Sequence, residues 1–313
     1  MSMNLKFSGY TVNNITGYTE QNKDVLVKNV VLGELAGDTI PFLKKQFGVK
    51  TSEKLNILNV DPALQDGSHC GFNPSGSTSF SNRVIETAQI KAEDAYCDKD
   101  LLSTFAEYLV KINAQKVPGD LPFEGYIMDE VIRKINEKME KLVWQGSKNG
   151  GDLIDGFMTQ ALNADSGVSG TIEVTAATGT AMYNRAKAVI EAIPEEILDK
   201  AVLFVSPANY RKLIFELVEK NLFHFAPGAD IEDKDVYFPG SEVRIHKTLG
   251  LKGSDNLYAS CYENMVYGAD LEGDSEKVRL WYEDKDQTFD YSIQWNAGVK
   301  TLFPDMVVVG KLA

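Results

Sequence analysis

The chain has 313 residues, of which 43% are hydrophobic and 25% are charged, a composition typical of a folded protein with one large domain or two. Its formal net charge is −13 and its Lys and Arg residues form no cluster, which argues against sequence-directed binding of nucleic acid. No apolar run is long enough to span a membrane, and residues 1–30 lack the pattern of a signal peptide. We therefore expect a protein that is made and kept in the cytoplasm.

The N-terminal region, residues 1–33, is predicted to be an extended polar arm. Apolar residues gather only near its end, at 25–27 and 30–32. A short helical segment is predicted next, because four apolar residues follow at helix-like spacing and Gly48 closes the segment. These four residues are Leu35, Ile40, Leu43 and Phe47.

A long hairpin is predicted within residues 49–97. Two strand-like runs, 54–60 and 83–91, flank a tip (61–82) that is rich in Gly, Ser, Asn and Asp. An isolated two-stranded hairpin is only marginally stable in water, and no nearby segment offers it a core. We therefore expect the hairpin to lean on another molecule, which indicates assembly rather than catalysis.

Two helices are predicted after the hairpin, over residues 98–113 and 123–144. The second has the strongest pattern in the chain, with apolar residues at spacings of three and four. They are Ile127, Val131, Ile135, Met139 and Leu142, with Met128, Ile132 and Val143 beside them. On the opposite side Glu137 and Lys141 form a favourable i,i+4 pair. At about 1.5 Å per residue this helix is roughly 30 Å long, enough to serve as a spine.

Residues 150–273 predict a compact α/β unit. An amphipathic helix over 178–193 precedes a continuously apolar strand at 201–205. Ser206 then provides an N-cap, and Pro207 occupies the first position of the next helix. Short strands are predicted at 243–246, 256–259 and 265–267.

The tail is predicted to be almost entirely strand, over 278–283, 288–299 and 306–310. In the middle strand four large apolar residues alternate with polar ones, so one face should be buried and the other wet. These apolar residues are Phe289, Tyr291, Ile293 and Trp295.

The chain offers few candidate catalytic residues. Its histidines are His69, His224 and His246, and its cysteines are Cys70, Cys97 and Cys261. No local pattern pairs any of them as a nucleophile and a base, and no GxSxG motif occurs. The cysteines are expected to be reduced, with a Cys70–Cys97 bridge across the hairpin as the alternative.

A phosphate-loop pattern and two acidic groups could indicate binding sites, but simpler explanations fit each of them better. Residues 71–78 copy the glycine spacing of a phosphate loop, but Ser77 stands where the Lys belongs. Two acidic groups could hold calcium weakly, although neither fits the twelve-residue calcium loop and turn chemistry explains them better. They are Asp270, Glu272 and Asp274, and Glu283, Asp284 and Asp286.

Aromatic residues in the tail could form a platform for stacking bases. Arg279 is the single basic residue in the two strands that carry them, so packing in a core or between subunits is the stronger interpretation. They are Trp281, Tyr282, Phe289, Tyr291 and Trp295. The sequence thus identifies no catalytic, cofactor-binding or metal-binding residue and implies no cofactor.

The order of these elements resembles the major capsid proteins of tailed bacteriophages, which have the α+β HK97-like fold. The resemblance covers essentially the whole chain through short, degenerate matches, and their order carries the weight. The matching segments are 123–126 (Phe-Glu-Gly-Tyr), 140–146, 155–157, 206–213, 238–243, 288–299 and 306–309.

The resemblance implies four parts. Residues 1–33 would be the N-terminal arm, and residues 49–97 would be the extended loop. The peripheral domain would consist of 34–48, 98–149 and 274–313, with its spine helix at 123–144. Residues 150–273 would form the axial domain.

The resemblance also implies a structural, non-enzymatic protein that assembles into hexamers and pentamers of an icosahedral phage or prophage head enclosing DNA. The expected partners are further copies of the chain, a separate scaffolding protein, a portal, and packaged DNA without sequence-specific contacts; no membrane is involved. The protein would reside in the virion after assembly in the host bacterial cytoplasm. Many relatives begin with a long helical scaffolding segment that is absent here, which implies a separate scaffold or earlier processing. The Lys–Asn cross-link of some relatives is not assigned.

Two alternatives stay open at the level of sequence. One is an encapsulin-type compartment, which shares the fold but holds a cargo enzyme. The other is an α/β enzyme that forms a small oligomer and has its site near residues 206–211, at a helix N-terminus.

Overall fold

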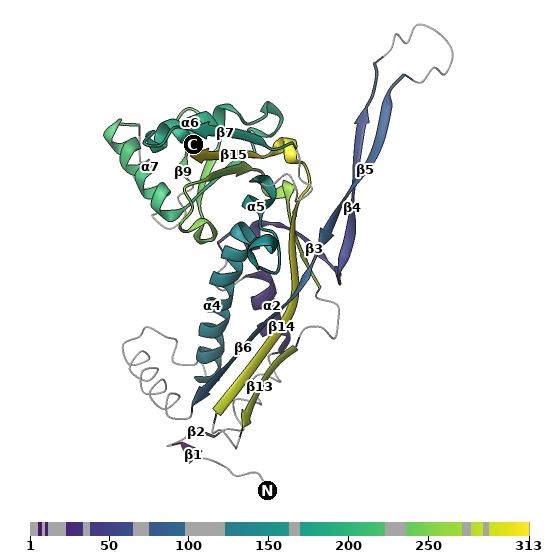
Figure 1. Ribbon diagram of the computed structural model, residues 1–313, viewed down its shortest axis with the longest axis vertical. Coiled ribbons are helices and arrows are strands. Elements are labelled where there is room, and N and C mark those ends of the chain that lie inside the picture. Colours follow the sequence, from purple (N-terminus) through teal and green to yellow (C-terminus); the bar gives the residue numbers. More distant parts are fainter. Residues whose placement is uncertain are drawn as a thin grey trace, which may run out of the picture.

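The computed structural model describes residues 6–7, 10–11, 23–33, 38–64, 75–97, 123–162, 170–222, 236–270, 277–283 and 288–312. Figure 1 shows three parts: an α/β part, a part built on helix α4 and a long sheet, and a two-stranded hairpin that projects beyond both. The helix predicted over 98–113, His69, His224 and Cys70 lie outside the described residues.

Helix α4, Phe123–Gln145, confirms the strongest helical pattern in the sequence. Its buried face follows the spacing of three and four, and Ile132 and Val143 are fully inaccessible. Helices α2 (Lys23–Leu32) and α5 (Phe157–Leu162) pack against it. The helix therefore forms the core of this part of the molecule.

The exposed face of α4 carries ion pairs that differ from the predicted one. Arg133 and Lys134 bind the two oxygens of Glu137, at 2.7 Å and 3.0 Å. Glu137 is thus engaged by residues on its N-terminal side rather than by Lys141. Exposed pairs of this kind contribute only about 0.3–0.5 kcal/mol each. Replacing the predicted Glu137–Lys141 pair by the observed pairs therefore changes the stability of the helix little.

Strand β14, Thr288–Thr301, is central to a five-stranded sheet. It pairs antiparallel with β6 (Ala88–Cys97), β13 (Lys277–Glu283) and β12 (Met265–Ala269), and β12 pairs in parallel with β3 (Lys44–Phe47).

The prediction of one wet face on this strand is wrong for its second half. Ser292 and Asn296 are buried as well as Ile293 and Trp295. The Ser292 hydroxyl donates to Glu93 at 2.9 Å, and the Asn296 amide donates to the carbonyl of Lys50 at 3.3 Å. Neighbouring segments therefore cover the face that the alternation assigned to solvent.

The projecting hairpin consists of β4 (Ser52–Asp61) and β5 (Ser77–Glu86). The predicted single strand over 83–91 is wrong: Glu86 ends β5, and the chain then enters β6, which belongs to the sheet around β14. The tip is also shorter than predicted, because Ser77–Asn82 pair with β4 despite their polar composition. Cross-strand hydrogen bonds decide this segment rather than the propensity of its residues.

The N-terminal predictions also need correction. Residues 23–32, assigned to an extended arm, form α2, whose Leu26, Val30 and Val31 are buried against α4. Of the helical segment predicted over 35–47, the described residues 38–47 instead form a short 3-10 turn, Ile40–Phe42, followed by strand β3, and Leu35 lies outside the described residues. In both places tertiary packing overrides local preference.

The α/β part contains a six-stranded sheet with the order β7-β15-β11-β8-β10-β9. These strands are Ile172–Ala176, Val308–Leu312, Leu257–Ser260, Val202–Val205, Arg244–Lys247 and Val236–Tyr237. Strand β8 is fully buried, as its apolar run predicts, and it pairs in parallel with β10 after a crossover through α7. Helices α6 (Met182–Glu191) and α7 (Pro207–Glu219) pack against each other beside the sheet, as Figure 1 shows.

The two sheets exchange strands along the chain. Strand β12 pairs with β14, whereas β15, from the tail, pairs with β7 and β11 in the α/β part. Sheet membership therefore does not follow the boundary expected at residues 273/274.

The remaining elements are short. Strands β1 (Lys6–Phe7) and β2 (Tyr10–Thr11) pair antiparallel. Further 3-10 turns are η2 (Lys148–Gly150), η4 (Glu195–Ile197), η6 (Leu249–Leu251), η7 (Tyr262–Asn264) and η8 (Pro304–Met306).

Candidate functional site

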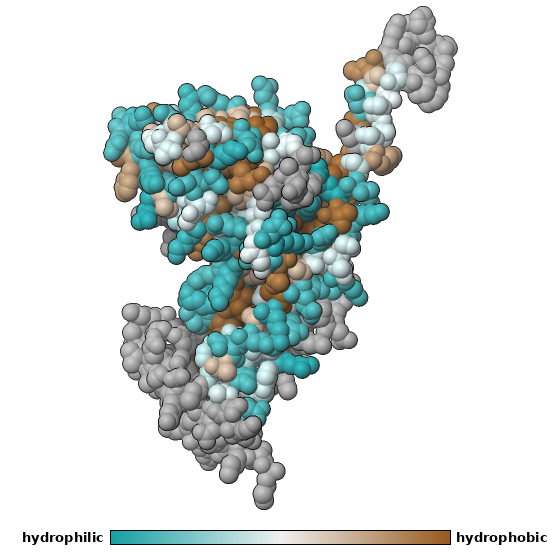
Figure 2. Space-filling model, viewed as in Figure 1, coloured by the Kyte–Doolittle hydropathy of each residue, from teal (hydrophilic) through white to brown (hydrophobic). Residues whose placement is uncertain are grey.

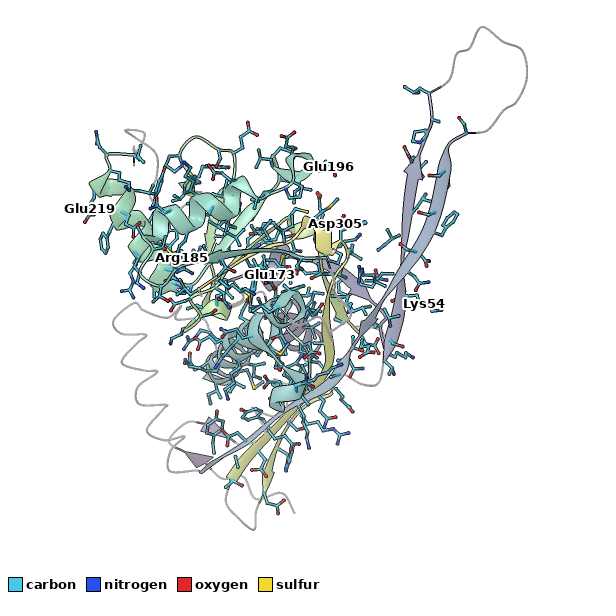
Figure 3. All side chains as sticks on the ribbon, turned by 45° about the horizontal axis from the view of Figure 1, so that its top comes forward. Lys54, Glu173, Arg185, Glu196, Glu219 and Asp305 are labelled. Carbon is cyan, nitrogen blue, oxygen red and sulfur yellow. The ribbon has the colours of Figure 1, made fainter. Side chains whose placement is uncertain are left out.

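The outer hairpin, defined as β4 and β5 beyond Leu55 and Arg83, exposes apolar side chains. The register places Leu58 directly opposite Phe80, so both lie on one face. Leu58 is 57% exposed, Phe80 is 81% exposed, and Val60 on the same face is 53% exposed. Figure 2 shows hydrophobic residues on this outer part, and Figure 3 shows it projecting beyond Lys54 with no other described element beside it. Apolar groups placed in this way indicate a surface that another molecule covers.

The base of the hairpin is anchored in the body, contrary to the expectation that no core lies near it. Ile85 is fully buried in a small apolar cluster with Val49, Val266 and Leu302. Strand β14 passes so closely that a Cβ on Gly298 would lie 2.0 Å from the carbonyl oxygen of Glu86. The hairpin is thus fixed at its base, and among the described residues no other element packs against its outer part.

A second notable region is the junction, defined as Thr39, Glu140, Trp144, Thr248 and Gly250. It joins α4 to η6 of the α/β part and to the segment that precedes β3. Glu140 is fully buried, and its Oε1 accepts hydrogen bonds from the backbone N–H groups of Thr39, at 2.7 Å, and Ile40, at 2.9 Å. Burial raises the pKa of the Glu140 carboxyl from 4.5 to about 7, although these two donors act in the opposite direction.

The side chain of Trp144 completes the junction. Its indole Nε1 donates to the Thr39 hydroxyl at 3.1 Å, and that hydroxyl bonds Thr248 at 3.0 Å. The Trp144 ring also packs against Phe204 and Tyr258, with centroids 4.9 Å and 5.3 Å apart. A Cβ on Gly250 would lie 2.0 Å from Trp144 Cδ1, so this position requires glycine. The junction therefore holds two parts of the subunit together.

The sequence interpretation did not single out Glu140 as buried. A signal was present, because Glu140 follows Asn136 by four residues and precedes Val143 by three, which places it on the buried stripe of α4. A polar residue on such a stripe predicts a buried partner. Its partners are backbone N–H groups some one hundred residues away in sequence, which no local pattern could identify.

Ser206 and His246 are both held by contacts within the subunit. Ser206 is 2% exposed, and its hydroxyl accepts a hydrogen bond from the Asn209 N–H as the predicted cap of α7. His246 lies near the end of β10 among aromatic rings, with its centroid 5.6 Å from Phe204 and 6.2 Å from Phe42. Ser206 thus acts as a helix cap, and His246 lies close to two aromatic rings.

The other predicted sites are only partly described. Of the two acidic groups, Asp270 is buried and Glu283 is exposed, while Glu272, Asp274, Asp284 and Asp286 lie outside the described residues. Ser77 and Thr78 of the phosphate-loop pattern belong to strand β5, so no helix follows that loop. Cys261 is buried without a disulfide, and burial raises the pKa of its thiol.

The tail aromatics pack mainly within the subunit. Trp295 is buried, and Tyr291 stacks on Tyr96 with centroids 5.9 Å apart, whereas Trp281 is 39% exposed. The side chains of Tyr282 and Phe289 lie outside the described set. Two of the described aromatics therefore serve the core, and Trp281 is the one on the surface.

The described ranges offer neither a metal site nor a membrane-spanning helix. They hold no group of three or more His, Cys, Asp or Glu side chains placed to bind a metal ion. Among the helices within those ranges, none has the length and apolar character needed to cross a membrane.

Neither models of known protein families nor curated proteins match this sequence. Solved structures do match. A chain of the satellite phage P4 procapsid including size determination (Sid) protein is 11% identical, with a TM-score of 0.61 over 100% of this chain and 94% of that one. A chain of the capsid of an empty GTA particle is 11% identical, with a TM-score of 0.57 over 91% and 90%. A chain of the holo-SrpI encapsulin complex from Synechococcus elongatus PCC 7942 is 9% identical, with a TM-score of 0.55 over 87% and 85%.

Likenesses at such low identity establish the fold. They extend over most of each chain, from 85% to 100%. The α+β, HK97-like fold expected from the sequence is confirmed.

Proposed function

We propose that this chain is the major capsid protein of a tailed bacteriophage or prophage, which assembles into hexamers and pentamers of an icosahedral head. The observation that carries the proposal is the outer hairpin, with its exposed Leu58–Phe80 pair. The likeness to chains of a phage procapsid and a GTA capsid supports it. The role is structural and requires no chemistry from the chain.

The hairpin supports assembly because its own subunit does not complete it. Its two strands form a separate two-stranded sheet, and such a sheet is marginal in water unless a third strand or another surface packs against it. Covering Leu58, Val60 and Phe80 would gain about 25 cal/mol for each Å² of apolar surface removed from water. Burying these side chains against a partner would therefore stabilise the hairpin and also contribute to the affinity between the two molecules.

A second copy of the chain is the partner that fits the arrangement. A contact between an arm on one copy and a different surface on the next copy is head-to-tail, and a head-to-tail contact closes into a ring when its rotation permits. A shell repeats each such interface many times, so modest interfaces suffice for a stable particle.

In this proposal the parts have distinct roles. The outer hairpin of the extended loop, 49–97, overlaps a neighbouring subunit, and the arm, 1–33, does so with the residues that precede α2. The peripheral domain (34–48, 98–149 and 274–313) carries the spine helix, and the axial domain (150–273) approaches the symmetry axis of each hexamer or pentamer. The strand exchange through β12 and β15 would make these two domains move as one body.

The charge of the chain suits a container for DNA. A wall built from subunits of net charge −13 repels a polyanion and does not hold it by sequence-specific contacts. The further partners in this proposal are a scaffolding protein and a portal. The protein would be assembled in the cytoplasm of the host bacterium and remain in the virion.

The test is a variant with a shortened hairpin. Leu55 and Arg83 are directly paired, so residues 56–82 can be replaced by Asn-Gly, which forms a two-residue turn between paired strands. The variant should keep the circular dichroism and unfolding transition of the wild type but form no particles in electron microscopy or sedimentation. Particles of normal size and yield from this variant would refute the role of the hairpin.

An encapsulin-type compartment is the second candidate, favoured by the likeness to a chain of the holo-SrpI encapsulin complex. Purified particles distinguish the two functions. Nuclease-protected DNA inside them supports the phage head, and a co-purifying enzyme supports the compartment. A small soluble oligomer with catalytic activity would instead support the enzyme alternative near residues 206–211.

A further inference from the structure

Two glycines lie side by side in the sheet next to the base of the hairpin. Gly268 of β12 and Gly298 of β14 are directly paired in the register of these antiparallel strands. Glycine weakens the interior of a strand, because it adds no side chain to the packing and loses more backbone freedom on folding than other residues. Two glycines at one paired position therefore indicate that another segment approaches the sheet closely there.

The segment that approaches is the end of β5, where the hairpin joins the body. A Cβ added to Gly298 would collide with the carbonyl oxygen of Glu86 and lie 3.0 Å from Thr87 Cα. A Cβ added to Gly268 would lie 2.8 Å from Ile85 Cδ1. The two glycines thus form a notch, defined as Gly268 and Gly298, that receives the base of the hairpin.

Hydrogen bonds tie both ends of the hairpin to the body at its base. The backbone N–H of Thr87 donates to the carbonyl of Thr51 at 2.9 Å, and its hydroxyl donates to the carbonyl of Val49 at 3.2 Å. The N–H of Val49 in turn donates to the carbonyl of Ala269, next to Gly268 on β12, at 3.4 Å. A displacement at the notch would therefore be passed to both strands of the hairpin.

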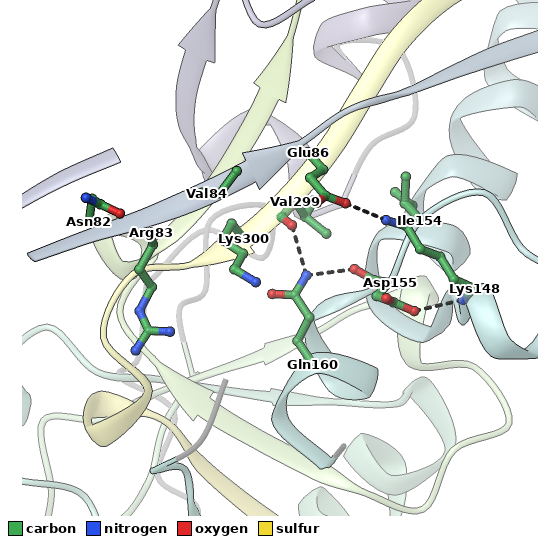
Figure 4. Close-up of a pocket in the computed structure, with 10 residues that line it drawn as sticks. All are labelled: Asn82, Arg83, Val84, Glu86, Lys148, Ile154, Asp155, Gln160, Val299 and Lys300. Atoms are coloured by element: carbon green, nitrogen blue, oxygen red, sulfur yellow. Dashed lines mark hydrogen bonds and ion pairs between the residues drawn. The ribbon is translucent and has the colours of Figure 1, made fainter. Parts of the chain in front are cut away.

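The base of the hairpin also borders a cavity of about 410 Å³. Its lining includes Arg83 and Glu86 from β5 and Lys300 from β14, as Figure 4 shows. Glu86 forms an ion pair with Lys148 at 2.8 Å, but both side chains are exposed, and such a pair gives weak support. A cavity offers no packed surface, so the close contacts of β5 with the body are those at the notch and in the apolar cluster around Ile85.

The hairpin is long compared with this attachment. Each strand has 10 residues, which at about 3.3 Å per residue give a ribbon about 30 Å long. A tilt of about 5° at the base therefore moves the end of the ribbon by about 3 Å. A contact that closes a ring of copies requires a definite rotation from one copy to the next, so such a shift changes the assembly that forms.

We propose that the notch positions the hairpin for its contact with a second copy of the chain, and thereby sets the angle between adjacent copies and the diameter of the particle. The inference deepens the proposed function and rests on it, because it concerns how neighbouring copies meet. Gly268 and Gly298 are positioning residues in this sense, since they act through the residues of the hairpin base.

Gly268→Ala tests the inference. The added methyl group meets the end of the Ile85 side chain and not backbone, so the subunit should fold, with its midpoint of urea unfolding lowered by no more than about 1 M. Because Ile85 is fully buried, the strand that carries it should move with its side chain. The fraction of particles with the wild-type diameter should then fall about fivefold or more in electron microscopy, in favour of other diameters or open assemblies.

Ile85→Val provides the rescue. It removes the Cδ1 atom that the new methyl group would contact and leaves the next atom, Cγ1, at 3.4 Å. The double variant Gly268→Ala with Ile85→Val should therefore recover the wild-type diameter, because the two substitutions act at one contact. Gly150→Ala, in η2, is the matched control, because a Cβ there would lie 3.4 Å from Ser147 Cβ, an ordinary contact distance. It should leave stability and diameter unchanged.

The outcomes separate this inference from the proposed function. If the wild type forms no particles, the proposed function fails. Wild-type diameters in Gly268→Ala, at any yield, would overturn the inference alone, because a loss of stability lowers the yield without changing the geometry. Failure of Gly268→Ala to fold would assign the notch to stability and likewise overturn the positioning role. An altered diameter that persists in the double variant would overturn the action through Ile85.

Discussion

The outer hairpin exposes apolar side chains to solvent, whereas the junction buries polar ones. The hairpin leaves Leu58 and Phe80 in solvent, while the junction buries the carboxylate of Glu140 and the hydroxyls of Thr39 and Thr248. In the junction Glu140 Oε1 and the hydroxyls of Thr39 and Thr248 have hydrogen-bond partners within the subunit, while Glu140 Oε2 is buried without one among the described residues. Under the proposed function, the outer hairpin is covered by a neighbouring copy. Substitutions in the junction should therefore affect subunit stability, and substitutions in the hairpin should affect assembly.

The largest effect on stability is expected for Trp144→Ala. The change removes a fully buried ring from its contacts with Phe204 and Tyr258 and leaves a cavity. The free energy of unfolding should fall by about 3–5 kcal/mol, as measured by urea denaturation. A loss below about 1 kcal/mol would show that the junction does not hold the subunit together.

The next effect depends on pH and concerns Glu140. Its pKa is about 7 in the folded chain and 4.5 ordinarily, so between these values the folded chain holds a proton that the unfolded chain has lost. Wild-type stability is therefore highest below pH 4.5 as far as this group is concerned. It decreases as the pH rises to about 7, by about 3 kcal/mol in total at 1.4 kcal/mol per unit.

Glu140→Gln isolates this contribution, because the amide keeps the shape of the side chain and does not titrate. The variant should lose the decrease between pH 5 and pH 8 and should be more stable than the wild type at pH 8. Urea denaturation at several pH values measures both quantities. Parallel pH profiles for the two proteins would mean that Glu140 does not titrate in this interval.

A smaller loss is expected for Thr39→Val, which keeps the volume but removes the hydroxyl shared by Trp144 and Thr248. Leaving the buried indole N–H without its acceptor should cost about 1–3 kcal/mol. Thr51→Val, at an exposed position near the hairpin base, should change stability by less than about 0.5 kcal/mol. Equal effects of the two substitutions would contradict the role assigned to the Thr39 hydroxyl.

The smallest effect on stability is expected for the double substitution Leu58→Ser and Phe80→Ser on the outer hairpin. Both side chains are exposed, so the free energy of unfolding of the subunit should change by less than about 0.5 kcal/mol. Particle formation should nevertheless decrease, as measured by sedimentation of paired wild-type and variant samples. Normal assembly would show that the apolar face of the hairpin is not an interface.

Local pattern was sufficient for several elements. The stripe of α4 predicted its helix to within a residue, and the apolar run before Ser206 predicted the buried strand β8. The Ser206–Pro207 pair predicted the start of α7 because capping is a property of adjacent residues. The order of such elements was also enough to indicate the fold.

Other elements depended on partners distant in sequence. The sequence by itself determined which segments are amphipathic, where α7 begins, and that the hairpin lacks a full core. Only the tertiary structure decided that residues 23–32 fold as a helix on α4, that β5 and β6 separate at Thr87, and that β15 joins the α/β sheet. It alone also places Glu140 beneath Thr39 and Lys300 beside Arg83. The physical reason is that helix periodicity and capping act over a few residues, whereas strand pairing and burial depend on segments that meet only in the folded chain.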